Sequence, residues 1–134
     1  MATLKLEIVT PESKVYSEDV DMVTLPGVEG EMGILPMHVP LMTQLTSGEI
    51  IARKGGQDFF LAVGDGFVEV TADRVSIITD MAIQAEHIDE VKAEEARWRA
   101  EARLAEKLDD TEVASVSAAL AHSLAQLKVK RRQK

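Results

Sequence analysis

The sequence predicts an α+β fold, in which an N-terminal antiparallel β-sandwich is followed by a C-terminal antiparallel α-helical hairpin. All 8 glycines and all 4 prolines occur before residue 67, whereas 11 of the 16 alanines occur at or after Ala85. Glycine and proline are typical of turns between strands, and alanine favours helices. We therefore expect one domain over residues 1–84 and a second over residues 88–134, joined closely through the short segment 84–87.

The first strands are indicated by residues that alternate between apolar and polar. Leu4, Leu6 and Ile8 alternate with charged residues, which is the period of a half-buried strand. Val20 and Met22 alternate with aspartates in the same way. We expect both segments to present one face to the core.

Two hairpins follow. The apolar segments 50–52 and 59–63 flank a Lys-Gly-Gly-Gln sequence at 54–57, which is a strong turn signal. The apolar segments 67–70 and 75–78 are joined by a second short polar stretch. Several short strands separated by regular turns favour a sandwich or barrel.

The C-terminal part has the spacing of two helices. Residues at intervals of three and four lie on one helical face, and small side chains let two such faces approach closely. The acidic segment 109–112 separates the two helices and is suited to cap the second. The apolar row of that second helix is Val113, Val116, Leu120, Leu124 and Leu127, beside a row of Ala114, Ala118, Ala121 and Ala125; the first helix has Ala93, Ala96, Ala100 and Leu104.

The overall composition excludes several classes of function. There are 15 basic and 23 acidic residues, a net charge of −8, so a basic surface for nucleic acid is not expected. There is no cysteine, which excludes disulfides, thiol catalysis and thiolate metal sites. No apolar run approaches the length of about 20 residues that a membrane span needs, and no secretory signal is visible at the start.

No catalytic residue and no metal site is predicted. The Gly27, Gly30 and Gly33 spacing differs from that of phosphate-binding loops, so we expect a tight surface turn there. The three histidines are scattered over different segments, which does not favour zinc. Trp98, the single tryptophan, is expected to serve in packing.

The segment 30–41 is apolar, yet its Gly and Pro content is too high for a core strand. Apolar residues on a stiff, irregular loop suggest a docking surface, although such a loop could equally cover one end of the sandwich.

This segment, Gly-Glu-Met-Gly-Ile-Leu-Pro-Met-His-Val-Pro-Leu, closely resembles the signature of the epsilon subunit of bacterial F-type ATP synthase. The segments 64–70, 74–82, 88–89 and 120–127 resemble further parts of that family in the same order. The resemblance implies a β-sandwich of two five-stranded sheets followed by a helix hairpin.

The resemblance also implies a non-catalytic subunit of the rotor stalk, without a cofactor. Such a subunit binds the gamma subunit and the c-ring, couples proton translocation to ATP synthesis, and meets the membrane only through the complex. Its expected location is peripheral, at the cytoplasmic face of a bacterial inner membrane. The residues expected at the c-ring and gamma contacts are Glu31, Pro36, Met37 and His38.

In this family the hairpin is mobile in many bacterial members, and when it extends into the alpha/beta catalytic head it blocks ATP hydrolysis. Some members also bind ATP through an Ile/Leu-Asp-x-x-Arg-Ala motif. Asp89 matches that motif but Lys92 replaces its arginine, and His122 and Gln126 stand where strong binders have arginines. Lysine lacks the planar, bidentate guanidinium. We expect Asp89 and Lys92 to support weak nucleotide contact at most.

Two other functional classes remain open on the residues alone. One is a free-standing adaptor that docks through the 30–41 loop, and the other is a small hydrolase with an unrecognised site. Neither has a motif of its own in the sequence.

Overall fold

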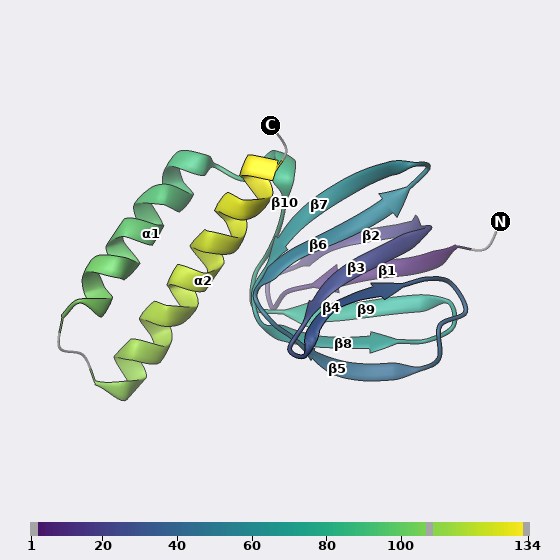
Figure 1. Ribbon diagram of the computed structural model, residues 1–134, viewed down its shortest axis with the longest axis horizontal. Coiled ribbons are helices and arrows are strands. Elements are labelled where there is room, and N and C mark those ends of the chain that lie inside the picture. The colour runs from purple at the N-terminus through teal and green to yellow at the C-terminus, as the bar shows by residue number, and fades with distance from the viewer. Residues whose placement is uncertain (1–2, 107–108, 133–134) are drawn as a thin grey trace.

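The computed structural model describes residues 3–106 and 109–132, in which ten strands precede two helices (Figure 1). This order confirms the predicted α+β class. The strands are β1 (Leu4–Val9), β2 (Lys14–Val20), β3 (Met22–Gly27), β4 (Gly30–Ile34), β5 (Leu41–Leu45), β6 (Gly48–Lys54), β7 (Gln57–Val63), β8 (Gly66–Val70), β9 (Arg74–Thr79) and β10 (Ala82–Gln84); a 3₁₀ turn η1 (Ala85–His87) leads to α1 (Glu90–Leu104) and α2 (Asp110–Arg132).

The strands form one continuous sheet that folds over on itself to make the sandwich. Its order is β10-β7-β6-β3-β5-β8-β9-β1-β2, and β4 pairs with β3 beside this path. Strands β3 and β5 meet only at Gly27 and Leu45, which is where the sheet passes from one layer to the other. Figure 1 shows β6 and β7 on one side of the sandwich and β5, β8 and β9 on the other.

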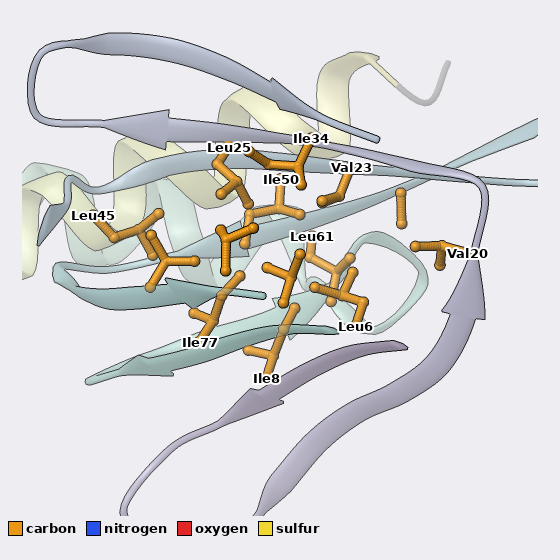
Figure 2. Packing of buried hydrophobic residues seen from close by; sticks show 14 of the residues in the cluster. Leu6, Ile8, Val20, Val23, Leu25, Ile34, Leu45, Ile50, Leu61 and Ile77 are labelled. Carbon is orange, nitrogen blue, oxygen red and sulfur yellow. The ribbon is translucent and has the colours of Figure 1, made fainter. Parts of the chain in front are cut away.

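The core fills the space between the two layers (Figure 2). The alternation expected for the first strand is confirmed, because Leu4, Leu6 and Ile8 are buried while the residues between them are partly exposed. Alternation places every second side chain of a strand on the same face, so strands β1 to β9 each contribute one to three residues to one shared core. Sixteen buried hydrophobic residues, from Leu4 to Ile77, make up this cluster.

Both predicted hairpins are confirmed. Strands β6 and β7 are joined by Gly55 and Gly56, whose φ angles of +60° and +80° belong to the left-handed region. A two-residue turn with positive φ at both positions matches the twist of a hairpin, and glycine adopts it without steric cost. Strands β8 and β9 are joined by the turn at residues 71–73.

Three expectations about the strands need correction. The pair β1–β9 is parallel, so the sandwich is antiparallel in every pair except this one. Val20 and Met22 do not share a strand: the chain bends at Asp21, and Val23 rather than Met22 is buried. The first half of the 30–41 segment is strand β4, since its backbone pairs with β3 and Ile34 enters the core.

The two helices begin at capped ends. The Asp89 carboxylate accepts a hydrogen bond from the backbone N–H of Lys92 at 3.1 Å, and the Asp109 carboxylate accepts one from Glu112 at 2.8 Å. A carboxylate at this position satisfies an N–H group that the first turn leaves unpaired. The cap predicted within residues 109–112 is therefore confirmed.

The hairpin packs on the sandwich through α2. In Figure 1, α2 lies next to the sheet and α1 lies outside it. Ala125 and Val129 of α2 form a buried cluster with Ala62 of β7, Ala85 and Ile88. Within the predicted alanine row of α2, Ala125 is buried against the sandwich, whereas Ala114 and Ala118 are exposed. Leu124 is 44% exposed, so the predicted apolar row is not buried along its whole length.

Candidate functional site

The segment between β4 and β5 is an exposed apolar loop at the end of the sandwich far from the helices (Figure 1). Met37 has φ of +68° and is 76% exposed, and Leu35 and Val39 are exposed as well. The loop is fixed at its tip, because the Met37 N–H donates a 2.8 Å hydrogen bond to the carbonyl of Ala72 in the β8–β9 turn. A non-glycine residue at positive φ is costly unless its surroundings hold it there.

The structure groups Pro36, Met37 and His38 on this loop. The His38 Nδ1 lies 2.7 Å from the carbonyl oxygen of Val39, which orients the ring along the loop. The half of the 30–41 segment that lies beyond β4 is thus the irregular apolar surface that the sequence predicted.

Glu31 lies apart from these three residues. It is the second residue of β4 and pairs with Pro26 of β3, beside the turn that joins those strands. The loop residues follow the opposite end of β4. Strand β4 ends at Ile34, so at about 3.3 Å per residue about 10 Å of strand lies between Glu31 and the start of the loop. The candidate docking residues therefore lie at two separate sites: Glu31 at one, and Pro36, Met37 and His38 at the other.

A second apolar surface was not identified from the sequence. Phe67 and Ile78 are direct cross-strand partners on β8 and β9, and they are 56% and 62% exposed. Val28 and Met42 are exposed beside them, and Val28 donates its backbone N–H to the carbonyl of Gln44, the cross-strand partner of Phe67. We call Val28, Met42, Phe67 and Ile78 the outer apolar row. The outward register of Met42, Phe67 and Ile78 on half-buried strands is the signal that could have identified three of the four.

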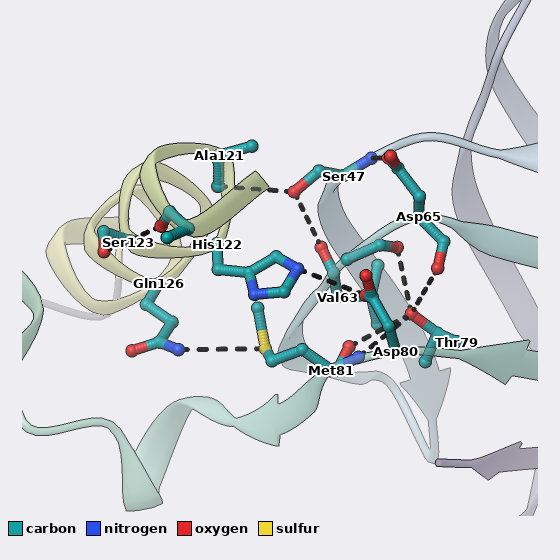
Figure 3. Close-up of polar contacts among 12 residues, drawn as sticks. Ser47, Val63, Asp65, Thr79, Asp80, Met81, Ala121, His122, Ser123 and Gln126 are labelled. Carbon is teal, nitrogen blue, oxygen red and sulfur yellow. Dashed lines mark hydrogen bonds and ion pairs between the residues drawn. The ribbon is translucent and has the colours of Figure 1, made fainter. Parts of the chain in front are cut away.

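The junction between α2 and the sandwich contains a polar network (Figure 3). The His122 Nε2 of α2 lies 3.2 Å from a carboxylate oxygen of Asp80, in the β9–β10 connection. The Ser47 hydroxyl lies 3.2 Å from the carbonyl oxygen of Val63 and 3.3 Å from that of Ala121, so it bridges the sheet and the helix. Side chains from both domains thus hold the two together.

The residues expected near a nucleotide have other roles in this conformation. Asp89 caps α1, and the Lys92 side chain is exposed. On α2, His122 contacts Asp80, and the Gln126 amide lies 3.7 Å from the Met81 sulfur. The two α2 positions where the resemblance expects arginines, His122 and Gln126, thus contact the sandwich.

The basic C-terminal segment also makes contacts within the chain. Arg131 pairs with Glu94 at 2.8 Å and with Glu90 at 3.4 Å, both on α1. The Lys130 ammonium lies 3.4 Å from the carbonyl oxygen of Ala85. The ion pairs are largely solvent-exposed, and such pairs contribute little stability. They orient the end of α2 against α1.

The expectation that Trp98 serves in packing is wrong. Its side chain is 65% exposed. Val91, two helical turns earlier on the same face of α1, is 67% exposed. The buried residues of α1 are Ala93 and Ala100. Because only this face of α1 is covered by a neighbour, the face that carries Trp98 stays exposed to solvent.

The arrangement offers no chemistry for bond cleavage at the α2 junction. Ser47 lies in the same region as His122 and Asp80, but its hydroxyl is directed to two backbone carbonyls and not to the imidazole. A nucleophile needs a hydrogen bond to its base. Within residues 3–106 and 109–132, no three His, Asp or Glu side chains gather as a metal site. Neither described helix is long and apolar enough to cross a membrane.

Comparisons with known proteins match the chain over nearly its whole length. The family model described as "ATP synthase, Delta/Epsilon chain, beta-sandwich domain" matches residues 3–85, and "ATP synthase, Delta/Epsilon chain, long alpha-helix domain" matches residues 86–131. The ATP synthase epsilon chain of Dehalococcoides mccartyi (strain CBDB1) is 49% identical over 130 residues, which is 96% of this chain and 93% of the relative. That of Syntrophobacter fumaroxidans is 48% identical over 126 residues, 94% of each chain.

Two solved structures of ATP synthases contain a chain with the fold of this protein. A chain in the cryo-EM structure of the Euglena gracilis mitochondrial ATP synthase (OSCP/F1/c-ring) superposes with a TM-score of 0.78 and 27% identity, covering 96% of this chain and 81% of that one. A chain from the central stalk and c-ring of the Tetrahymena thermophila mitochondrial ATP synthase superposes with a TM-score of 0.61, at 14% identity, and shows the fold alone.

Proposed function

The chain belongs to the ATP synthase delta/epsilon chain family, and on that premise we propose that it is a rotor subunit whose docking surfaces and helix hairpin have separate tasks. As an epsilon chain it is a non-catalytic part of the ATP synthase and not a free-standing adaptor or a hydrolase. The observation that carries the proposal is the match of both domains, in order, to epsilon chains nearly half identical in sequence.

The proposed partners of the sandwich are the gamma subunit and the c-ring. The loop 35–40 and the outer apolar row are continuous, because a shallow hollow lined by Pro40, Met42 and Glu69 lies between them. An exposed apolar surface of this kind is suited to a permanent protein interface. We assign the outer apolar row to gamma, and the loop 35–40 together with the carboxylate of Glu31 to the polar loops of the c-ring.

The c-ring contact is tested by the coupling of proton pumping to ATP turnover, and the gamma contact by recovery of gamma with the tagged chain. Glu31→Lys should lower the ratio of proton pumping to ATP turnover in membranes, while Phe67→Glu should reduce recovery of gamma with the tagged chain. Glu12→Lys is a matched control, since Glu12 is exposed on the β1–β2 turn. An unchanged coupling ratio for Glu31→Lys would remove Glu31 from the c-ring contact. His38→Ala should weaken coupling without unfolding the sandwich.

The helix hairpin is proposed to regulate ATP hydrolysis. The described conformation has it docked on the sandwich through one small apolar cluster and a few polar contacts. An element with such a limited interface can exchange it for another partner when that partner binds the released state better. The released hairpin would extend to the alpha/beta head and block hydrolysis. Deletion of residues 88–134 should then raise the ATPase activity of the complex, and unchanged activity would count against inhibition.

Nucleotide binding by this chain is proposed to be weak. Lys92 keeps the charge of the motif arginine but not its fork of donors, and His122 and Gln126 already contact the sandwich. Titration of the full chain with ATP should give no saturation in the micromolar range, and a micromolar dissociation constant would refute this. We further propose that the complex, and with it this chain, lies at the cytoplasmic face of the bacterial inner membrane.

A further inference from the structure

The junction between the two domains leaves no room for a side chain at Gly64. A Cβ built on this residue would overlap a carboxylate oxygen of Asp80 and would lie 2.6 Å from the His122 Nε2. The Gly64 backbone does not have a positive φ, so glycine is needed there for space and not for its conformation. We call Gly64, Asp80 and His122 the docking contact; Figure 3 shows its Asp80 and His122 side chains.

The Gly64 backbone cannot shift to relieve such an overlap. Its N–H donates a 2.8 Å hydrogen bond to the carbonyl of Met81, and its own carbonyl accepts one at 3.0 Å from the buried hydroxyl of Thr79. The Asp80 backbone is held in turn, because its N–H donates to the carbonyl of Asp65 at 3.2 Å, whereas its carboxylate is the half-exposed end of a side chain. Hydrogen bonds thus hold the backbone of Gly64 to β9 and to the β9–β10 connection. His122, by contrast, lies on α2, outside the sandwich.

An added methyl group at residue 64 would therefore displace the ends of the Asp80 and His122 side chains and separate the pair that joins α2 to the sandwich. Overlap is relieved most easily where the structure is least constrained. The α2 contacts with the sandwich are the small apolar cluster around Val129 and a few hydrogen bonds, such as that of Ser47 to the Ala121 carbonyl. The sandwich, by contrast, is held by its whole core.

We propose that the docking contact sets the fraction of molecules in which the hairpin lies on the sandwich, with Gly64 as the position that permits docking and the His122–Asp80 pair as the contact that favours it. This inference rests on the proposed regulatory role of the hairpin and names the residues that control it. In the docked state the pair fills the space above Gly64, and in a released state that space opens to solvent.

The chain is well suited to a direct measurement. It has one tryptophan, Trp98 on α1, and no cysteine. Thr46→Cys provides a single labelling site on the sandwich, since Thr46 is exposed and next to Ser47. Energy transfer from Trp98 to a fluorophore at residue 46 reports docking in the full chain. A urea titration followed by energy transfer, and in parallel by circular dichroism of the strands, separates release of the hairpin from unfolding of the sandwich.

In this background, Gly64→Ala should lower the ratio of docked to released molecules by up to about fivefold, the contribution of one partly exposed ion pair. The energy-transfer midpoint should fall while the sandwich midpoint stays. Gly33→Ala is the matched control, because its Cβ would displace only the Cε of Met22, which belongs to β3 and not to the docking contact. Equal midpoints for both variants would overturn the proposal, as would a fall of the sandwich midpoint alongside the hairpin midpoint.

A cycle of variants tests the mechanism. If the methyl at residue 64 acts by displacing Asp80 and His122, then Gly64→Ala should have little further effect in a chain that already carries Asp80→Ala and His122→Ala. An undiminished effect in that chain would contradict the assignment.

The ATPase of the assembled complex distinguishes this inference from the proposed function. Gly64→Ala should lower ATP hydrolysis if the released hairpin inhibits. If Gly64→Ala releases the hairpin in the isolated chain but leaves hydrolysis unchanged, the proposal that the hairpin inhibits is refuted. The proposal that the docking contact controls docking is then still supported. If energy transfer shows no release, the docking contact fails whatever the ATPase does.

Discussion

Val129 is the side chain that anchors α2 to the sandwich most completely, so its truncation gives the clearest prediction about hairpin docking. It is 0% exposed and lies in the cluster with Ala62, Ala85 and Ile88. Val129→Ala removes two buried carbon groups, each contributing about 0.8 kcal/mol by transfer from water, with a further term for the cavity. The expected loss of docking free energy is about 2 kcal/mol, or roughly thirtyfold in the docking equilibrium.

The assay is the urea dependence of energy transfer between Trp98 and a fluorophore at residue 46, with the sandwich monitored separately by circular dichroism. Leu124→Ala is the control, because Leu124 lies on the same helix but is 44% exposed. It should cost less than about 1 kcal/mol. The reasoning would be refuted if both variants shifted the hairpin transition equally, or if Val129→Ala shifted only the sandwich transition.

Three further variants test the local account. Asp89→Ala should lower the stability of α1 by about 1 kcal/mol in thermal unfolding followed at helical wavelengths, whereas Asp89→Asn, which keeps a cap acceptor, should not. Gly66→Ala should destabilise the sandwich by about 3 kcal/mol in urea unfolding, because its Cβ would overlap the backbone carbonyl of Ile78; wild-type stability would contradict this. The hydrogen bond and charge of Lys14 hold the pKa of Glu7 below its usual range. Glu7 therefore contributes stability that is present above its unfolded pKa of about 4.3 and is lost as the pH falls through its lower folded pKa. Glu7→Gln should accordingly make the free energy of unfolding less dependent on pH below about pH 5. An unchanged pH dependence in this range would count against the Glu7–Lys14 ion pair.

Sequence patterns captured the fold where local chemistry determines it. The Gly55-Gly56 turn needs positive φ at two positions, and glycine is the residue that adopts it, so the β6–β7 hairpin was predictable. The cap at Asp109 follows from the hydrogen-bonding capacity of its carboxylate. Such features depend on residues close together in the chain.

Features that depend on distant parts of the chain were not predictable in the same way. The parallel pairing of β1 with β9 joins the two ends of the sandwich sequence, and no local pattern encodes it. Strand β4 forms because β3 offers its backbone hydrogen bonds, which overrode the irregular composition of the 30–41 segment. Trp98 is exposed because only one face of α1 is covered, and the spacing of α1 alone does not say which.

The candidate sites show the same division. The residues at Pro36, Met37 and His38 could be grouped because they are adjacent in sequence, but their separation from Glu31 depends on the direction of β4. The docking contact escaped the sequence analysis because its three residues come from the β7–β8 connection, the β9–β10 connection and α2. Only the packing of α2 on the sandwich brings them together.

The central claim is that this chain works as a rotor subunit of an ATP synthase, and its most direct test is isolation of the chain with its partners. The chain should be tagged in its host, purified from detergent-solubilised membranes, and the co-purifying subunits and ATPase activity recorded. The account predicts one copy of the chain in a large ATPase that contains gamma and the c-ring. Recovery of the chain alone from the soluble fraction, without ATPase activity, would contradict it.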